Sequence, residues 1–173
     1  MGKKRSYGKR GIVTGGGILL SVFIIIVTVL SIRWSFSPKL LGDRYESHIF
    51  ANSIFKLLSV AVNDDGQLLA FTDSAHYNDS FVFEYDEDED AYFIYKTIHG
   101  NVMYLNETTE HDLIVDYAPD ASGGYWDVDR VGNTMYYMIV NHTDGYAIYM
   151  ADSTRAMLAP ADPSNESMHM RLQ

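Results

Sequence analysis

Three stretches of the chain after residue 50 share one order of elements. Each begins with a strand that opens on an aromatic residue, continues through a turn glycine into an apolar strand, and closes with a large hydrophobic residue. The strand openings are Phe55-Lys56-Leu57, Tyr92-Phe93-Ile94 and Tyr137-Met138-Ile139, the glycines are Gly66, Gly100 and Gly145, and the closing residues are Phe81, Trp126 and Met168. A recurrence of about 41 residues indicates a fold built from three copies of one unit.

The strands of these units are short and rich in β-branched and aromatic residues, and Asp-Gly, His-Gly and Gly-Asn turn signals separate them. No stretch after residue 32 keeps a helical period with caps for more than a turn or two. Three four-stranded units can close into a barrel, which removes exposed sheet edges. We therefore expect an all-β domain over 49–173, a β-trefoil of three repeats of about 41 residues.

An apolar run precedes this domain. From Ile12 to Ile32 the chain holds 21 residues without a charge, long enough for a helix to cross about 30 Å of hydrocarbon. A cleaved signal peptide is the alternative, but its apolar region usually spans only about 7–15 residues, and no small-x-small cleavage site follows this run. The sequence therefore predicts one transmembrane α-helix at 12–32, with the lipid bilayer as its partner.

The charges set the expected topology. Residues 1–11 carry five basic side chains, and Arg33, Lys39 and Arg44 follow the apolar run, so the positive-inside bias favours a cytoplasmic tail at 1–11. Residues 33–48 are expected to form a stalk, and 49–173 an extracellular or lumenal domain. The net charge of −10 would repel phosphate backbones, so nucleic acid is not an expected partner.

Two segments carry a resemblance to a known family. The stretch from Gly123 to Val128, leading to Tyr136 to Asn141 and Gly145, resembles the ricin-type lectin repeat, in which Gln-x-Trp closes one unit and Tyr-x-Ile-x-Asn followed by Gly opens the next. Residues 152–170 are similar to the third unit of fungal members. The resemblance implies a β-trefoil that binds carbohydrate, with a glycan or glycoprotein as its partner.

The chain departs from the family where sugar is held. The resemblance places a sugar-binding Asp in the strand after each turn glycine, and this chain has Ala70, Tyr104 and Tyr149 there. Neither Ala nor Tyr can make the charge-assisted hydrogen bonds of a carboxylate. The resemblance thus implies weak or altered sugar specificity; the alternative is a protein-interaction trefoil that has lost sugar binding. The candidate ligand-binding residues are Asp73, Tyr104, Tyr149 and Asp152, since the two carboxylates lie just beyond the altered strands.

Four Asn-x-Ser/Thr sequons, at Asn78, Asn106, Asn141 and Asn165, predict a glycoprotein. Asn78 and Asn165 both lie three residues before a closing residue, and Asn141 lies in the opening strand, where the resemblance implies an Asn that makes structural hydrogen bonds. Asn106 occupies neither kind of repeat position.

No enzyme motif is present in the sequence. It has no cysteine, P-loop, Gly-x-Ser-x-Gly or His-Glu-x-x-His, and the six histidines are scattered. The acidic run from Asp86 to Asp90 lacks the glycine usual in a calcium loop and is expected to be a solvated hairpin turn. His111 beside Asp112 is expected at the surface. We expect no enzyme, no cofactor and no metal site.

Overall fold

The computed structural model describes residues 39–51, 56–63, 66–72, 79–120, 122–152 and 154–173. The chain divides into two compact units, 1–37 and 38–173, and the described residues belong to the second. The expected basic tail and transmembrane helix lie outside the described residues, as does the stalk up to residue 38. Within the described part of the chain, no helix is long and apolar enough to span a membrane.

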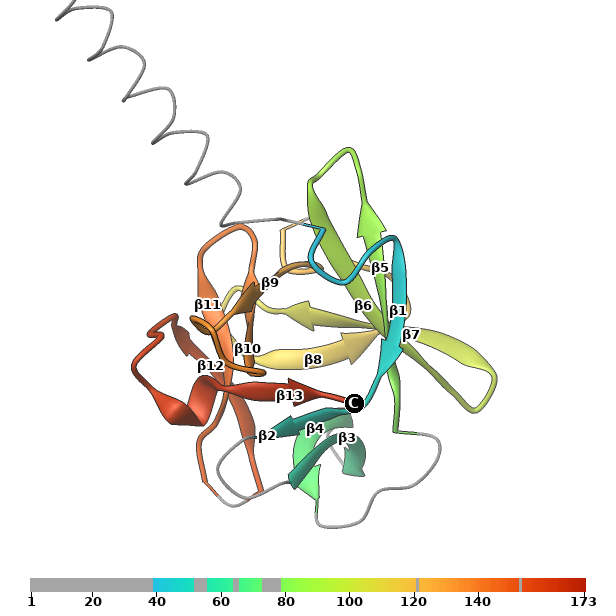
Figure 1. Ribbon diagram of the computed structural model, residues 1–173. Coiled ribbons are helices and arrows are strands. Elements are labelled where there is room, and N and C mark those ends of the chain that lie inside the picture. Colours follow the sequence, from blue (N-terminus) through green and yellow to red (C-terminus); the bar gives the residue numbers. More distant parts are fainter. Residues whose placement is uncertain (1–38, 52–55, 64–65, 73–78, 121, 153) are drawn as a thin grey trace, which may run out of the picture. The chain divides into compact units, whose positions relative to one another are not determined.

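The described residues form an all-β structure with one short 3-10 helix, as predicted (Figure 1). The strands are β1 (Arg44–Ser47), β2 (Ile49–Ala51), β3 (Lys56–Asn63), β4 (Gly66–Thr72), β5 (Phe81–Asp86), β6 (Ala91–Ile98), β7 (Asn101–Glu107), β8 (Leu113–Asp116), β9 (Tyr125–Arg130), β10 (Tyr137–Asn141), β11 (Tyr146–Met150), β12 (Ala156–Pro160) and β13 (Met170–Leu172), and the helix is η1 (Glu166–Met168).

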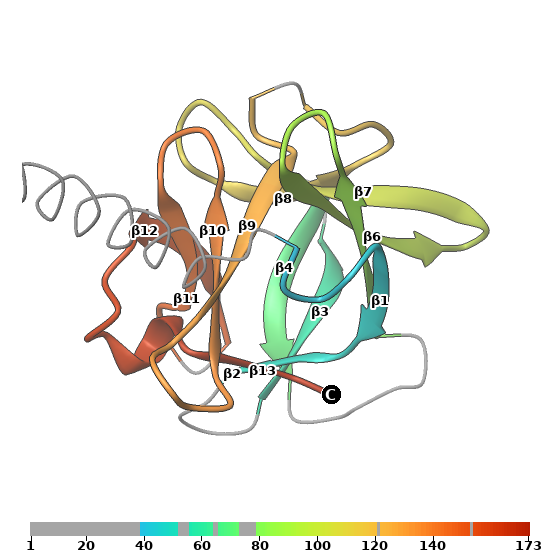
Figure 2. The same cartoon turned by 45° about the horizontal axis from the view of Figure 1, so that its top comes forward.

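The strands pair as three units. In unit 2 (β6 to β9), the first strand β6 pairs with β7, β9 and the preceding β5. In unit 3 (β10 to β13), β10 likewise pairs with β11, β13 and the preceding β9. The unit 3 strands β10, β11 and β12 lie together on one side of the fold (Figure 1, Figure 2).

Unit 1 repeats this pattern with a broken first strand. One residue, His48, separates β1, which pairs with β5, from β2, which pairs with β3 and with β13 of unit 3. The pairs β1 with β5, β5 with β6, β6 with β9, β9 with β10, β10 with β13 and β13 with β2 therefore run from one half of this broken strand round to the other half. This arrangement fits the threefold closure expected of a β-trefoil.

Unit 1 begins earlier in the chain than the sequence pattern indicated. Its first strand is not at Phe55-Lys56-Leu57 but at β1 and β2, and β3 and β4 are its second and third strands. Strand β1 lies inside the segment expected to be a stalk. The physical reason is strand pairing: all four residues of β1 pair with β5, and Ser47 at its end is 2% exposed.

The three closing residues are core residues, as the repeat predicted. Phe81 and Trp126 are fully buried in the main hydrophobic cluster. Met168 is buried in a smaller cluster with Met138, Val140 and Ala147. The indole Nε1 of Trp126 donates a hydrogen bond of 3.0 Å to the carbonyl oxygen of Leu105. The barrel core is thus a packed support for the loops and hairpins around it.

Candidate functional site: a pocket between three hairpins and the cluster at its rim

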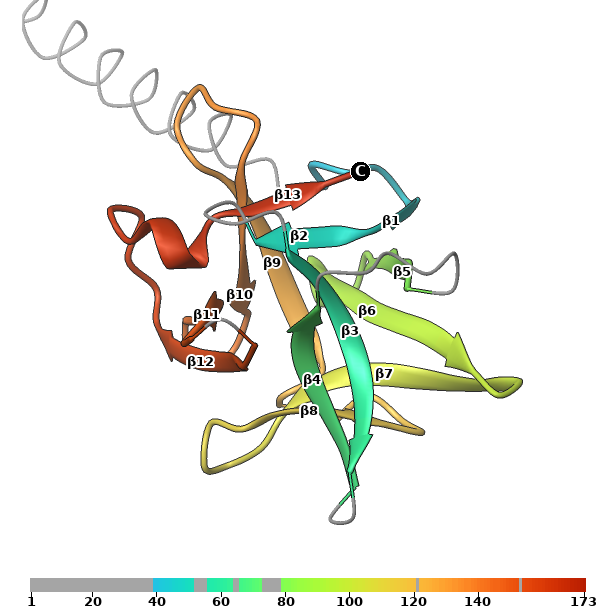
Figure 3. The same ribbon diagram turned by 90° about the horizontal axis from the view of Figure 1, so that it is seen from below.

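A pocket of about 330 Å³ lies where the third strands of the three units meet. Strand β4 pairs with β8 through the register Leu68 to Ile114, and β12 lies beside both strands. Figure 3 shows β4 and β8 side by side. The lining residues are Leu69 from β4, His111, Asp112, Leu113 and Ile114 from the turn before β8 and its first half, and Arg155, Ala156 and Met157 at the start of β12.

The pocket has an apolar floor and a charged rim. Leu69 and Leu113 are 4% and 5% exposed and belong to the main core cluster. Asp112 and Arg155 are exposed, and Met157 is 36% exposed. A site with an apolar surface and a few polar groups at its edge is the usual form of a small-ligand site.

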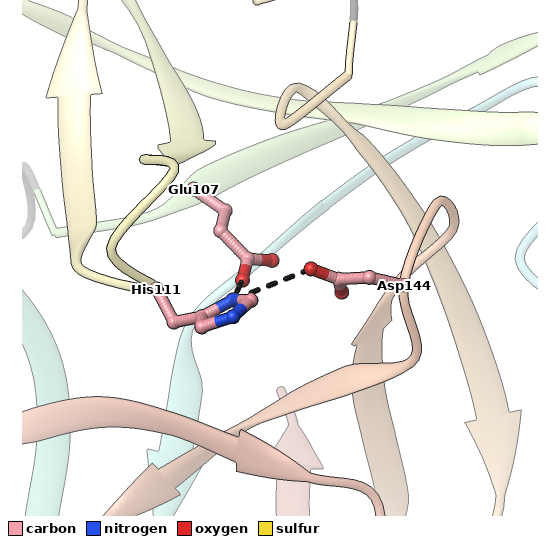
Figure 4. Close-up of side chains that lie close together, drawn as sticks. All are labelled: Glu107, His111 and Asp144. Carbon is pink, nitrogen blue, oxygen red and sulfur yellow. Dashed lines mark hydrogen bonds and ion pairs between the residues drawn. The ribbon is translucent and has the colours of Figure 1, made fainter.

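One rim residue, His111, belongs to a cluster of three titratable side chains drawn from three segments (Figure 4). Glu107 ends β7, His111 lies in the turn between β7 and β8, and Asp144 lies in the turn between β10 and β11. His111 Nδ1 lies 2.5 Å from Glu107 Oε1 and 3.3 Å from Asp144 Oδ2. Units 2 and 3 therefore meet through these side chains.

The backbone and a stacked ring fix the imidazole of His111. The turn is closed by hydrogen bonds from His111 N to Thr108 O, 3.0 Å, and from Thr108 N to Asp112 O, 2.9 Å. His111 has a φ of +62°, which is uncommon for a residue with a side chain and marks local strain. Its ring stacks on that of Tyr146 with centroids 3.8 Å apart and an interplanar angle of 4°.

The electrostatics of the cluster follow from burial and pairing. The Glu107 side chain is only 3% exposed, and burial raises the pKa of its carboxyl group, although the hydrogen bond from His111 opposes this. The same hydrogen bond to Glu107 raises the pKa of His111. Glu107 and His111 thus stabilise each other's charged form, while burial disfavours a lone charge on Glu107.

Tyr104, a predicted ligand residue, lies away from the pocket in a row of four half-buried rings that we call the aromatic ladder: Tyr95, Tyr104, Phe93 and Tyr125. Tyr104 lies opposite Tyr95 across β6 and β7, with ring centroids 5.4 Å apart. Phe93 lies opposite Tyr125 across β6 and β9, with centroids 4.6 Å apart.

The predicted residues Tyr149 and Asp152 lie on the β11 and β12 side of the pocket. Tyr149 is half-buried, packs against the Met138 and Met168 cluster, and pairs in register with the pocket residue Met157. Asp152 Oδ2 accepts a hydrogen bond of 2.8 Å from Arg155 Nε, so it holds a side chain that lines the pocket. Hydrogen bonds from Thr154 and Arg155 lower the pKa of Asp152. Asp73 lies outside the described residues.

The cluster was not predictable from the sequence. The His111 side chain is 40% exposed, in keeping with the expected surface position, but its contacts with Glu107 and Asp144 were not expected. The spacing of Glu107 and His111 is a weak local signal. Asp144 comes from the next unit, so only the fold brings it to the other two.

The sequons at Asn106 and Asn141 are used by the fold. Their side chains are 3% and 1% exposed. Asn106 Nδ2 donates to Ala118 O at 2.8 Å, and Asn141 Nδ2 donates to Gly123 O at 3.2 Å. A glycan attached to either nitrogen would have to displace these buried bonds. At the half-buried Asn165 the hydrogen bonds are made by Oδ1, which accepts from Ser167. Asn78 lies outside the described residues.

No protein-family model and no curated protein sequence matches the chain. Solved structures do match it. SeviL bound to asialo-GM1 saccharide is 12% identical at a TM-score of 0.58, over 74% of this chain and 95% of its own. The Polyporus squamosus lectin bound to the human-type influenza-binding epitope Neu5Acα2-6Galβ1-4GlcNAc is 13% identical to the chain at a TM-score of 0.63. The match covers 76% of this chain and 49% of the lectin.

A GlcNAcα1-4Gal-releasing endo-β-galactosidase from Clostridium perfringens is 14% identical to the chain at a TM-score of 0.60. The match covers 73% of this chain and 31% of the enzyme, so the chain spans about a third of the enzyme's length. At these identities the likeness shows the fold alone. The chain has an all-β fold similar to that of these structures.

Proposed function

We propose that this chain is a membrane-anchored carbohydrate-binding module of the ricin-type kind with altered sugar specificity. The observation that carries the proposal is the pocket of about 330 Å³ between the three hairpins of a lectin-like fold. In this proposal the sugar binds there, and the altered strand positions at Ala70, Tyr104 and Tyr149 do not hold it. A binding role, rather than catalysis, fits a pocket with one exposed carboxylate on its rim.

The chemistry of the pocket suits a single sugar ring. Ligand pockets span about 300–1,000 Å³, so this volume lies at the small end of that range. A sugar ring offers an apolar face of C–H groups, which would lie on Leu113 and Met157. Its hydroxyl groups would bond to Asp112 and Arg155, because hydrogen bonds to charged groups are the stronger ones.

A glycan array with the full-length chain tests the site. We expect Met157→Glu to abolish binding, because it places a charge on the apolar lining at a position that is 36% exposed and therefore tolerant. Met135→Glu is the matched control, since Met135 is 57% exposed and does not line the pocket, and it should bind as the parent does. Loss of binding in Tyr104→Ala with binding retained in Met157→Glu would move the site to the aromatic ladder.

The second candidate function is protein binding, and the aromatic ladder favours it. Glu84 Oε2 accepts a hydrogen bond of 2.7 Å from the hydroxyl of Tyr95. At the other end, the charges of Asp86, Glu89 and Asp88 add to the effect of burial in raising the pKa of Tyr125. Half-buried rings beside carboxylates suit a partner segment rich in Lys or Arg. A blank glycan array for the parent chain would favour this alternative.

The anchor and topology are part of the proposal. The charge-free run at 12–32 and the five basic residues before it support a cytoplasmic N-terminus, with the domain outside the cell or in the secretory lumen.

We expect a chain made in a secretory host to carry a glycan at Asn165 but none at Asn106 or Asn141. The test uses a chain that carries Asn78→Gln. Glycosidase treatment should lower the mass of this chain, and adding Asn165→Gln should abolish that loss of mass. Asn106→Gln and Asn141→Gln should leave that loss of mass unchanged, because their amide nitrogens are buried and hydrogen-bonded. A glycan lost with Asn106→Gln would contradict the described packing.

Digestion of the domain by protease added from the cytoplasmic side would overturn the topology.

A further inference from the structure

We propose that Glu107, His111 and Asp144 bind one divalent transition-metal ion, with Zn²⁺ as the best-matched metal. The inference goes beyond carbohydrate binding and does not depend on it. The ion would join the turn between β7 and β8 to the turn between β10 and β11, and so connect units 2 and 3 beside the pocket.

The distances between the ligand atoms fit a metal. One nitrogen and two carboxylate oxygens lie within 4.8 Å of one another, with His111 Nδ1 at 2.5 Å from Glu107 Oε1 and 3.3 Å from Asp144 Oδ2. Tetrahedral zinc with bonds of about 2.0–2.1 Å places its ligand atoms roughly 3.3 Å apart. The distance from His111 Nδ1 to Asp144 Oδ2 already matches this spacing, and the distance to Glu107 Oε1 would have to lengthen. Three protein ligands leave a fourth position for water.

The buried oxygen of Glu107 supplies an independent argument. Within the described part of the chain, Glu107 Oε2 is the buried side-chain atom that has no hydrogen-bond partner. Its side chain is 97% buried, and Figure 4 shows the carboxyl group directed toward Asp144. Burying a carboxylate oxygen without a partner is costly. Two carboxylates that face each other either share a proton or hold a cation, and the imidazole beside them completes a metal-ligand set.

The supporting groups hold the ligands in place. Stacking on Tyr146 orients the His111 ring, and the Asp144 carboxylate accepts a hydrogen bond of 3.1 Å from Tyr146 N. The Glu107 backbone N–H donates to Gly123 O at 2.9 Å. Such contacts fix ligand orientation and strengthen metal sites.

The ligand types select the metal. Calcium takes six to eight oxygen ligands and magnesium keeps several waters, so neither suits a set with one nitrogen and two carboxylates. Imidazole with carboxylate suits zinc and its neighbours in the first transition row.

Calorimetric titration of the full-length chain with Zn²⁺, after treatment with a chelator and without any glycan, tests the site. We expect one ion per chain and a higher Tm with zinc. Asp144→Asn should weaken the affinity by about a hundredfold or more, since losing even a supporting partner costs 10–100-fold. The Asp144 side chain is 34% exposed, so this variant should fold, and His111→Gln should behave alike.

The chain offers a matched control. His142 Nδ1 lies 2.9 Å from Asp127 Oδ1, and the two side chains are about as exposed as those of His111 and Asp144. Among the described residues, no third His, Asp or Glu side chain lies close enough to this pair to complete a set of three metal ligands. His142→Gln should therefore leave the zinc affinity within twofold of the parent. No zinc binding by the parent, or equal affinity in Asp144→Asn and the parent, would overturn the proposal in favour of a proton shared by the carboxylates. Neither result bears on the glycan array.

Discussion

Replacing Trp126 by alanine lowers the free energy of unfolding by about 3–5 kcal/mol. Trp126 is fully buried and is among the largest side chains in the core. Its removal leaves a cavity that the paired strands β6, β9 and β10 cannot close by collapsing. The substitution also removes the hydrogen-bond donor of the Leu105 carbonyl oxygen, which accepts the 3.0 Å bond from the indole nitrogen. Both effects act on the junction of units 2 and 3.

Urea unfolding followed by circular dichroism measures the loss. Trp126→Phe separates the two contributions, because it keeps most of the apolar volume but removes the indole donor, and it should destabilise the chain by a smaller amount. Leaving a buried acceptor unpaired costs about 1–3 kcal/mol. A Trp126→Ala chain with the unfolding midpoint of the parent would mean that the repeat register around Trp126 is wrong.

Units 2 and 3 were predictable because their local signals agree with the fold. The aromatic starts at Tyr92 and Tyr137 and the closing residue Trp126 lie in strands of the barrel; burial alternates along most of β6 and β9, and β10 is buried from Met138 to Asn141. In unit 1 the first strand is broken at His48 into β1 and β2, and neither half has the aromatic-x-aliphatic start. The matching tripeptide at Phe55 lies in a later segment. Strand pairing within the barrel, and not local pattern, decides where unit 1 begins.

The candidate site was predictable only in part. Asp152 was selected from the loop after β11, and the structure links it to the pocket through Arg155. Tyr104 was selected by the same argument, but its ring packs in the aromatic ladder. The pocket combines residues from all three units, and the Glu107 cluster combines two turns. Contacts of this kind depend on strand pairing across the whole barrel, which periodicity within one unit cannot reveal.

Gly123→Ala should destabilise the chain by about 3 kcal/mol or more, the upper end for overpacking. A Cβ at this position would lie 2.0 Å from the backbone oxygen of Glu107. Because that atom belongs to the backbone of β7, no side-chain rotation can relieve the overlap. Separating the two segments would also break the bonds that Gly123 O accepts from Glu107 N, at 2.9 Å, and from Asn141 Nδ2, at 3.2 Å.

Gly132→Ala is the control that separates space from backbone conformation. Gly132 has a φ of +54° and nothing within 4 Å of an added Cβ, so alanine there should cost only the left-handed strain of about 1–2 kcal/mol. The structure assigns Gly123 no such φ, and its cost comes from space alone. Chemical unfolding of both variants should therefore show the larger loss at Gly123. The reverse order would mean that the loop before β9 does not pack against the end of β7, and Glu107 would then lose the support that aims it at His111.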